Sequence, residues 1–161
     1  CVDRIGGSED RWIAPITDEG LGALFLQINR NKRSITLDTR KERGQDILRK
    51  LIAQADVVIS NVPTSALPAM GIDYASLSAI KPDIIQLSLK MWGTEGPLAY
   101  QTGYAPCFAA LAGLNYLVGH EGEVPRGMNI RYGDSTAGAC AALACISRPS
   151  RSRCSRRSRR Y

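Results

Sequence analysis

An aspartate near the end of the chain stands where its carboxylate could act as a nucleophile. Asp134 follows Gly133 and precedes a run of small apolar residues that ends at Ile146. We expect this run to form a helix that begins near Ser135. The unpaired backbone N–H groups at the start of a helix favour a negative charge and could stabilise an oxyanion. The glycine beside the carboxylate would leave room for a substrate carbonyl. The same placement suits a simple helix N-cap, and the spacing alone favours that second interpretation.

The elements that must position this carboxylate alternate between strands and helices. Compact apolar runs predict strands, and apolar residues at a period of 3.6 predict helices. Strands are expected at 34–38, 56–60 and 84–89, with 1–7 as the end of another, and helices at 21–30, 40–55, 73–83 and 104–118. Loops are expected at 90–103 and 119–131, and 61–73 is expected to be a turn with room for one helical turn inside it. This alternation is typical of βαβ units. We therefore predict an α/β fold with a Rossmann-like parallel sheet flanked by helices.

The basic charge of the chain is concentrated at its end. The formal net charge is +6 over 161 residues, but 147–161 hold seven arginines and no acidic residue, and the rest has 14 basic against 15 acidic residues. Residues 1–146 are therefore close to neutral, and they are long enough for one folded domain. The Arg/Ser-rich tail has nothing to bury in a core, so we expect it to be disordered. Because the chain does not begin with Met and starts as if inside a strand, we expect a fragment that is incomplete at both ends.

Several kinds of site are disfavoured by what the sequence lacks. Five cysteines form no C-x-x-C pair, and the single histidine, His120, has no thiolates at ligand spacing. We therefore expect no metal site and the reduced thiols of a cytoplasmic protein. No G-x-G-x-x-G fingerprint or P-loop is present, which disfavours NAD. No apolar run approaches the ~20 residues of a membrane span, so we expect no membrane partner.

Several motifs follow one another along residues 1–146. They are LQINRNKRSITLDTRKERGQDILRKLIAQADVVISNV at 26–62, GIDYASLSAIKPDIIQLSLKMWGTEGP at 71–97, GY and ALAGL within 103–114, and GDSTAG at 133–138. In this order they resemble the family III CoA-transferases, the group of formyl-CoA and carnitine CoA-transferases. The resemblance implies that 1–146 are the partial CoA-binding α/β domain of a longer enzyme.

The resemblance also implies a reaction and its nucleophile. Family members move CoA from an acyl-CoA to a carboxylic acid through an aspartyl intermediate, and Asp134 matches the attacking aspartate. A carboxylate suits this reaction because each covalent intermediate keeps the acyl group at comparable activation. The implied partners are an acyl-CoA, which brings coenzyme A, and a carboxylate acceptor. With the family pattern, we favour the nucleophile over the helix cap.

Contacts to CoA are implied at positions that match those of the family. These positions are Arg4, Leu37, Asp38, Arg40, Asn61, Val62, Pro63 and Tyr104. Arg4 and Arg40 suit the phosphates, although solvated surface arginines are the alternative. The basic segment 29–34 either adds to the positive electrostatic field at the phosphate site or is a solvated turn. Two positions depart from the family: Ala69 stands where formyl-CoA transferase has a phosphate-contacting arginine, and Ala105 stands where many members have an acid.

Alternatives to a transferase remain open. A related branch racemises 2-methylacyl-CoA with a His/Asp pair, but Tyr104 occupies the histidine's position and is a poor base near neutral pH. The tail at 147–161 could bind nucleic acid with salt-sensitive affinity, or it could be out-of-frame translation. An intact family member is expected to be an interlocked homodimer. A fragment without the second domain is not expected to make that interlock.

Overall fold

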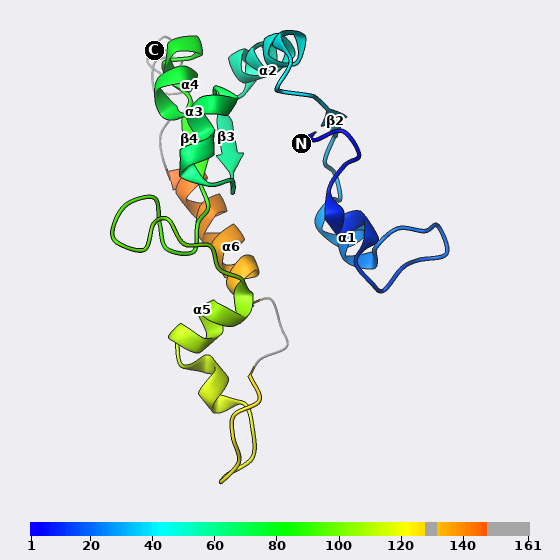
Figure 1. Cartoon of the computed structure of the whole chain (residues 1–161), viewed down its shortest axis with the longest axis vertical. Helices are drawn as coiled ribbons and strands as arrows, with labels where there is room; N and C mark the ends of the chain where they lie inside the picture. Colours follow the sequence, from blue (N-terminus) through cyan, green and yellow to red (C-terminus); the bar gives the residue numbers. More distant parts are fainter. Residues whose placement is uncertain (128–131, 148–161) are drawn as a thin grey trace, which may run out of the picture. The chain divides into compact units, whose positions relative to one another are not determined.

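The chain forms two compact units, each built on one pair of short parallel strands (Figure 1). The computed structural model describes residues 1–127 and 132–147. The first unit covers Cys1–Leu51, and the second begins at Ile52. The predicted tail beyond Ser147 lies outside the described residues, and so do positions 128–131 of the predicted loop.

The first unit is organised by the pairing of β1 with β2. The backbone N–H of Ile35 donates to the carbonyl of Cys1 at 3.0 Å, and the N–H of Leu37 donates to that of Asp3 at 2.9 Å. Leu37 is buried where β2 ends. The elements of this unit are β1 (Val2–Asp3), the 3-10 helix η1 (Glu9–Trp12), α1 (Ala23–Ile28), β2 (Ile35–Thr36) and the first part of α2 (Glu42–Gln54).

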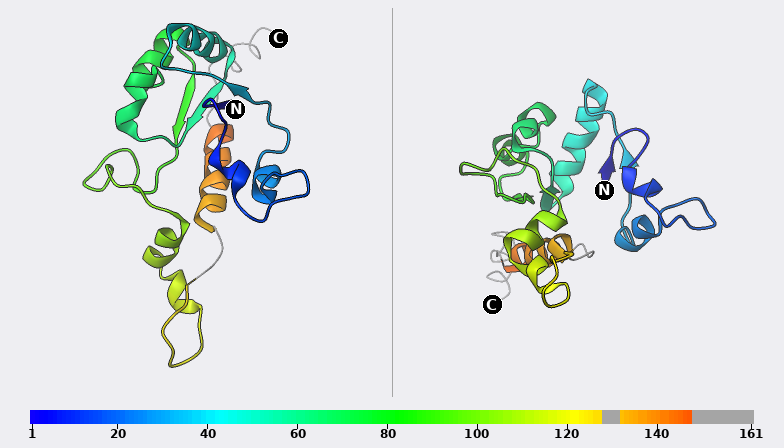
Figure 2. Two further views of the ribbon diagram at one scale, coloured as in Figure 1. Left: turned by 45° about the vertical axis from the view of Figure 1, so that its right-hand side comes forward. Right: turned by 60° about the horizontal axis from the view of Figure 1, so that its bottom comes forward.

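The second unit is organised by a longer parallel pair. The register of β3 and β4 runs from Val57 opposite Ile85 to Ser60 opposite Ser88, and Figure 2 shows α4 alongside these strands. Leu77 of α4 is fully buried. The elements are β3 (Val57–Ser60), η2 (Thr64–Ala66), α3 (Leu67–Met70), α4 (Tyr74–Ile80), β4 (Ile85–Ser88), α5 (Ala105–Leu111), η3 (Leu114–Leu117) and α6 (Tyr132–Ser147).

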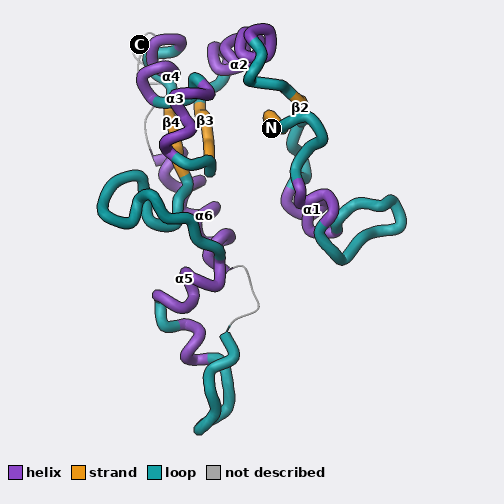
Figure 3. Tube along the Cα trace, in the orientation of Figure 1, coloured by secondary structure: helices purple, strands orange, loops and turns teal. Residues whose placement is uncertain are grey.

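The helices of the last third differ from the sequence-based prediction at two boundaries. The single helix expected over 104–118 is wrong, because α5 ends at Leu111 and Gly113 adopts a left-handed φ of 73° before η3 (Figure 3). Glycine reaches this conformation without a steric penalty and so ends helices efficiently. The helix expected from Ser135 begins earlier, at Tyr132.

The start of α6 is held against α5 by close packing at a glycine. A Cβ added to Gly133 would lie 2.7 Å from Cδ2 of Phe108, a distance that real side chains do not adopt. The two helices also carry buried alanines, namely Ala105 and Ala109 in α5 and Ala141 in α6. Small residues therefore let these two helices approach each other.

The predicted fold class is confirmed within the described residues. Strands and helices alternate, and both strand pairs are parallel. Among the described residues, no helix is long and apolar enough to span a membrane.

Two glycines of α6 should respond to alanine in opposite directions. Gly133→Ala forces the Phe108 ring to move, so we expect a loss of about 1–3 kcal/mol in the free energy of unfolding. Gly138→Ala is the matched control, since nothing lies within 4 Å of the added Cβ. It should stabilise the chain by about 0.5–1 kcal/mol through helix propensity. Urea unfolding measures both, and a stabilising Gly133→Ala would contradict the packing.

Candidate active site

Predicted CoA-binding residues of the first unit lie where its two strands end. Arg4 follows β1 directly, and Leu37 and Asp38 follow β2. Because parallel strands present their carboxyl ends at one edge, these residues share that edge, where open α/β sheets bind ligands. Gly44 in the first turn of α2 packs so closely on the carbonyl of Asp38 that a Cβ has no room. This contact fixes the turn after β2.

Asp38 and Arg40 form a two-point ion pair in that turn. Arg40 Nε lies 2.9 Å from Oδ1 and Nη2 lies 3.3 Å from Oδ2, while the Arg40 backbone N–H also donates to Oδ1. The side-chain hydrogen bond is the main reason that the pKa of Asp38 is lowered and that the pKa of Arg40 is raised. The Arg40 side chain stays 89% exposed, so it remains open to an anionic ligand.

Arg4 is held in a similar local arrangement. Its Nη2 lies 2.7 Å from Oε1 of Glu9, and its Nε donates to the carbonyl of Gly7 at 3.2 Å. The side chain is 67% exposed. An arginine has five N–H donors, so donors remain beyond these two bonds. Arg4 and Arg40 are therefore accessible cations, each already engaged with one carboxylate.

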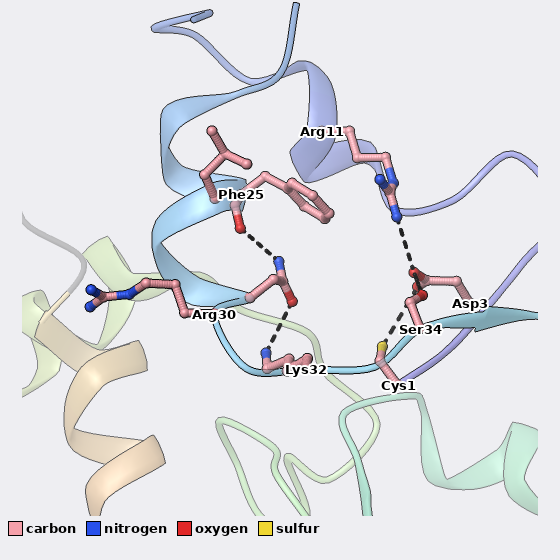
Figure 4. Close-up of a pocket in the computed structure, with 9 residues that line it drawn as sticks. Cys1, Asp3, Arg11, Phe25, Arg30, Lys32 and Ser34 are labelled. Carbon is pink, nitrogen blue, oxygen red and sulfur yellow. Dashed lines mark hydrogen bonds and ion pairs between the residues drawn. The ribbon is translucent and has the colours of Figure 1, made fainter. Parts of the chain in front are cut away.

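A cavity of about 310 Å³ lies elsewhere in the first unit (Figure 4). Its wall includes Arg30 and Lys32 of the basic segment 29–34, and Lys32 Nζ donates to Oδ1 of Asn29 at 3.1 Å. The full lining is Cys1, Asp3, Arg11, Phe25, Leu26, Asn29, Arg30, Lys32 and Ser34. None of the predicted CoA-binding residues lines this cavity.

In the second unit, the loop after β3 contacts Lys90, which lies just after the end of β4. Leu89 N–H donates to the carbonyl of Ser60 at 2.8 Å, so the backbone pairing extends to Leu89. Lys90 Nζ then lies 3.4 Å from Oγ1 of Thr64, just beyond the predicted CoA-binding segment Asn61–Pro63. Sequence reasoning missed Lys90; its place directly after a predicted strand is the signal that could have found it.

The long loop after β4 brings Tyr104 back to the same edge. Lys90 Nζ donates to the carbonyl of Ala99 at 3.0 Å, and Met91 packs on Gly103 so closely that a Cβ has no room there. The two ends of the loop are therefore close together. Tyr104 follows Gly103 as the N-cap residue of α5, and its ring is exposed.

Asp134 lies near Tyr104 because of the packing of α5 against α6. Phe108, one helical turn after Tyr104, contacts Gly133, which directly precedes Asp134, and the starts of the two helices are adjacent in Figures 1 and 2. Gly133 is predicted to leave room for a substrate carbonyl. At the position where a Cβ would lie, this prediction is wrong, because the ring of Phe108 fills that space.

The interpretation of Asp134 as a helix N-cap is wrong. Asp134 is the third residue of α6, is exposed, and forms no hydrogen bond or ion pair within the part of the chain that the structure describes. A true capping aspartate looks different: Asp73 precedes α4, and its Oδ1 accepts from the Ser76 N–H at 3.2 Å. Hydrogen bonds from Ser76 also lower the pKa of Asp73. The carboxylate of Asp134 is thus free for other contacts.

Metal and disulfide chemistry find no support in the ranges 1–127 and 132–147. No group of three His, Cys, Asp or Glu side chains there could hold a metal ion. The cysteines in these ranges are unpaired, namely Cys1, Cys107, Cys140 and Cys145.

Comparisons with known proteins show which family the chain belongs to. The pattern of CoA-transferase family III matches residues 1–151. Succinyl-CoA:glutarate CoA-transferase of Mus musculus is 32% identical over 142 residues, which are 87% of this chain and 32% of that protein. Formyl-CoA:oxalate CoA-transferase of Streptomyces coelicolor is 37% identical over 114 residues, or 71% of this chain and 28% of that protein.

A solved structure shares the fold. The crystal structure of a CAIB/BAIF family protein from Brucella suis superposes with a TM-score of 0.85 at 37% identity, over 91% of this chain and 40% of that one. The chain belongs to CoA-transferase family III, which confirms the predicted family. It spans about a third of the length of the curated succinyl-CoA:glutarate CoA-transferases to which it is similar.

Removing the Arg40 side chain should raise the pKa of Asp38. In Arg40→Met we expect the Asp38 carboxyl to titrate near the usual aspartate value of 3.8 rather than below it, followed by its ¹³C NMR shift. Because the pKa of Asp38 is lower in the folded chain than in the unfolded chain, the ion pair stabilises the fold at pH values above the unfolded-state pKa. This stabilisation is lost as the pH falls through the folded-state pKa. Arg43 lies in the first turn of α2, and Arg43→Met should leave the titration of Asp38 unchanged. An unaltered Asp38 titration in Arg40→Met would contradict the pair.

Proposed function

We propose that this chain is the CoA-binding α/β part of a CoA-transferase, with residues 1–146 as the CoA-binding domain and Asp134 as the covalent nucleophile. The observation that carries this proposal is the exposed, unpaired carboxylate of Asp134 in the first turn of α6. This turn packs against α5, the helix that Tyr104 precedes, in a chain of CoA-transferase family III. The family assignment and the geometry of the site support the same residue.

The proposed reaction uses the carboxylate as a carrier of CoA. An Asp134 oxygen attacks the thioester carbonyl carbon, the C–S bond breaks, and the CoA thiolate leaves a mixed anhydride on the aspartate. The thiolate then attacks the Asp134 carbonyl carbon of the anhydride, which releases the donor acid as its carboxylate and leaves an aspartyl-CoA thioester. The acceptor carboxylate repeats the sequence in reverse, so the new acyl-CoA departs and Asp134 is restored. No oxidant, metal or net proton is required.

The helix that carries Asp134 supports these steps electrostatically. Asp134 lies in the first turn of α6, where unpaired N–H groups and the helix dipole favour negative charge. The same N–H groups suit the oxyanion that forms when the carboxylate adds to a carbonyl carbon. Because the Asp134 side chain makes no bond within the described residues, it can reach a substrate without breaking a contact.

The CoA moiety is proposed to contact the strand edges. Arg4 and Arg40 offer exposed guanidinium groups to phosphates, which arginine binds well with its forked donors. Asn61, Val62 and Pro63 lie directly after β3, and Tyr104 lies where the next loop returns. Leu37 is buried and Asp38 binds Arg40, so these two shape the turn that presents Arg40.

The substrates are proposed to be an acyl-CoA and a small carboxylic acid. The two enzymes compared above are named for glutarate and oxalate as acceptors and for succinyl-CoA and formyl-CoA as donors. The unpaired thiols fit a reducing compartment, so we propose a cytoplasmic location. For an intact family member we propose a homodimer.

Covalent trapping tests the nucleophile. The full chain is incubated with succinyl-CoA, the aspartyl thioester is trapped with hydroxylamine, and the modified peptide is located by mass spectrometry. We expect the hydroxamate on Asp134 and its loss in Asp134→Asn.

Asp83→Asn is the matched control. Asp83 is also an exposed carboxylate of the second unit, but it precedes β4 and so lies at the other end of the strands. Trapping in this variant should equal that of the unmodified sequence. A label on any residue other than Asp134, or no label from any acyl-CoA, would overturn the proposal.

A further inference from the structure

Lys90 is a half-buried cation at the centre of the edge that holds the second unit's predicted residues. It follows Leu89, just after β4 ends, next to the loop that begins at Asn61 and beside the return of the chain to Tyr104. Its ammonium donates to two neutral oxygens, Thr64 Oγ1 at 3.4 Å and the carbonyl of Ala99 at 3.0 Å. It forms no ion pair with any carboxylate of the described residues. An ammonium group has three donors, so one is left for a ligand.

Lys81 shows how the chain treats a similar lysine at the opposite end of β4. Its Nζ also donates to a backbone carbonyl, that of Ala55 at 2.6 Å, and its side chain is 20% exposed. The Lys81 ammonium, however, also lies 3.4 Å from Oδ1 of Asp56, which neutralises its charge. A partly buried charge is unfavourable without such a partner. The charge of Lys90 therefore lacks the anion that the charge of Lys81 has.

The sequence around this edge contains no other basic residue. Between Lys81 and Arg126 the only Lys or Arg is Lys90, and the segment 61–73 has neither. Within that segment, Ala69 lies in α3 and offers no charge to a phosphate. The indole N–H of Trp92, two residues after Lys90, is buried and has no acceptor among the described residues. Donors thus exceed acceptors where β4 ends.

We propose that Lys90, held by Thr64 and Ala99, binds a phosphate group of the CoA thioester at the carboxyl end of β3 and β4. This inference rests on the proposed function and adds the cation for this part of the substrate. The bond is a charge-assisted hydrogen bond from the third N–H of the ammonium to a phosphate oxygen. A carboxylate of the acceptor acid is the other oxyanion that could occupy the position.

Calorimetric titrations of the full chain test the proposal with four probes: CoA, dephospho-CoA, inorganic pyrophosphate and glutarate. Lys90→Met keeps the aliphatic stem and removes the charge, so we expect CoA and pyrophosphate to bind about tenfold more weakly. Lys81→Met is the matched control, because it removes the same charge at the other end of β4, and we expect less than a twofold change. Lys90→Arg should restore pyrophosphate binding to within about threefold.

The hydrogen bond from Lys90 to the carbonyl of Ala99 also holds the loop after β4 in place, so Lys90→Met could weaken binding by disturbing this loop. A measurement on the unsubstituted chain avoids this effect. In the unsubstituted chain, the ¹³C–¹H NMR signal of the Lys90 ε-methylene should shift on addition of pyrophosphate, whereas that of Lys81 should not. If the penalty of Lys90→Met disappears with dephospho-CoA, the bound group is the 3′-phosphate; if it persists, the group is the diphosphate. Both results support the site.

The outcomes separate this inference from the proposed function. CoA binding that is equal in Lys90→Met and the unsubstituted chain overturns the inference and leaves the function intact. Pyrophosphate binding through Lys90 without any CoA binding overturns both the function and the assignment of Lys90 to a phosphate of CoA. A penalty for glutarate but not for CoA would assign Lys90 to the carboxylate and overturn the phosphate proposal. No response to any probe overturns both.

Discussion

Parallel strand pairing is the interaction on which the candidate site depends. In each unit the backbone hydrogen bonds hold two strands side by side in the same direction, so the chain must leave both strands at one edge. Arg4 and Asp38 are neighbours for this reason in the first unit, and Asn61 and Lys90 are neighbours for this reason in the second. None of these pairs is close in sequence. A slip of one residue in either register would move the side chains to the other face.

Two further contacts extend the edge of β3 and β4 to the nucleophile. The loop after β4 is closed by Lys90 on Ala99 and by Met91 on Gly103, which returns the chain to Tyr104. Phe108 on Gly133 then sets the first turn of α6 beside α5. The glycines at these contacts are required for close approach rather than for flexibility. This packing positions the first turn of α6, and the Asp134 side chain in that turn stays exposed.

The elements that local pattern determines were predictable from the sequence. The apolar stripe of α2 and the β-branched run of β3 fix those elements, and the order of motifs indicated the family. The start of α6 is not predictable in this way, because Tyr132 and Gly133 carry no capping signal. The end of α5 is not predictable either, because Gly113 lies within an apolar segment that is typical of one longer helix.

Contacts between distant segments were beyond local pattern. Lys90 lies 26 residues from Thr64, and no spacing rule links a lysine to a threonine at that distance. The reason for Gly133 lies in the ring of Phe108, which belongs to another helix. Such information exists only once the strands have paired and the helices have packed. The nucleophilic role of Asp134 therefore stays a prediction, whereas the packing of Phe108 on Gly133 gives that glycine a purpose that the sequence pattern did not indicate.

Backbone amide NMR during a titration with CoA tests the central claim most directly. If the carboxyl ends of the strands bind CoA, the largest shifts will fall on 4–8, 37–40, 61–64 and 89–92, and on the first turns of α5 and α6. If the largest shifts instead fall on the cavity around Phe25 and Asn29, or on residues that precede β3 and β4, with the carboxyl ends unchanged, the account is contradicted.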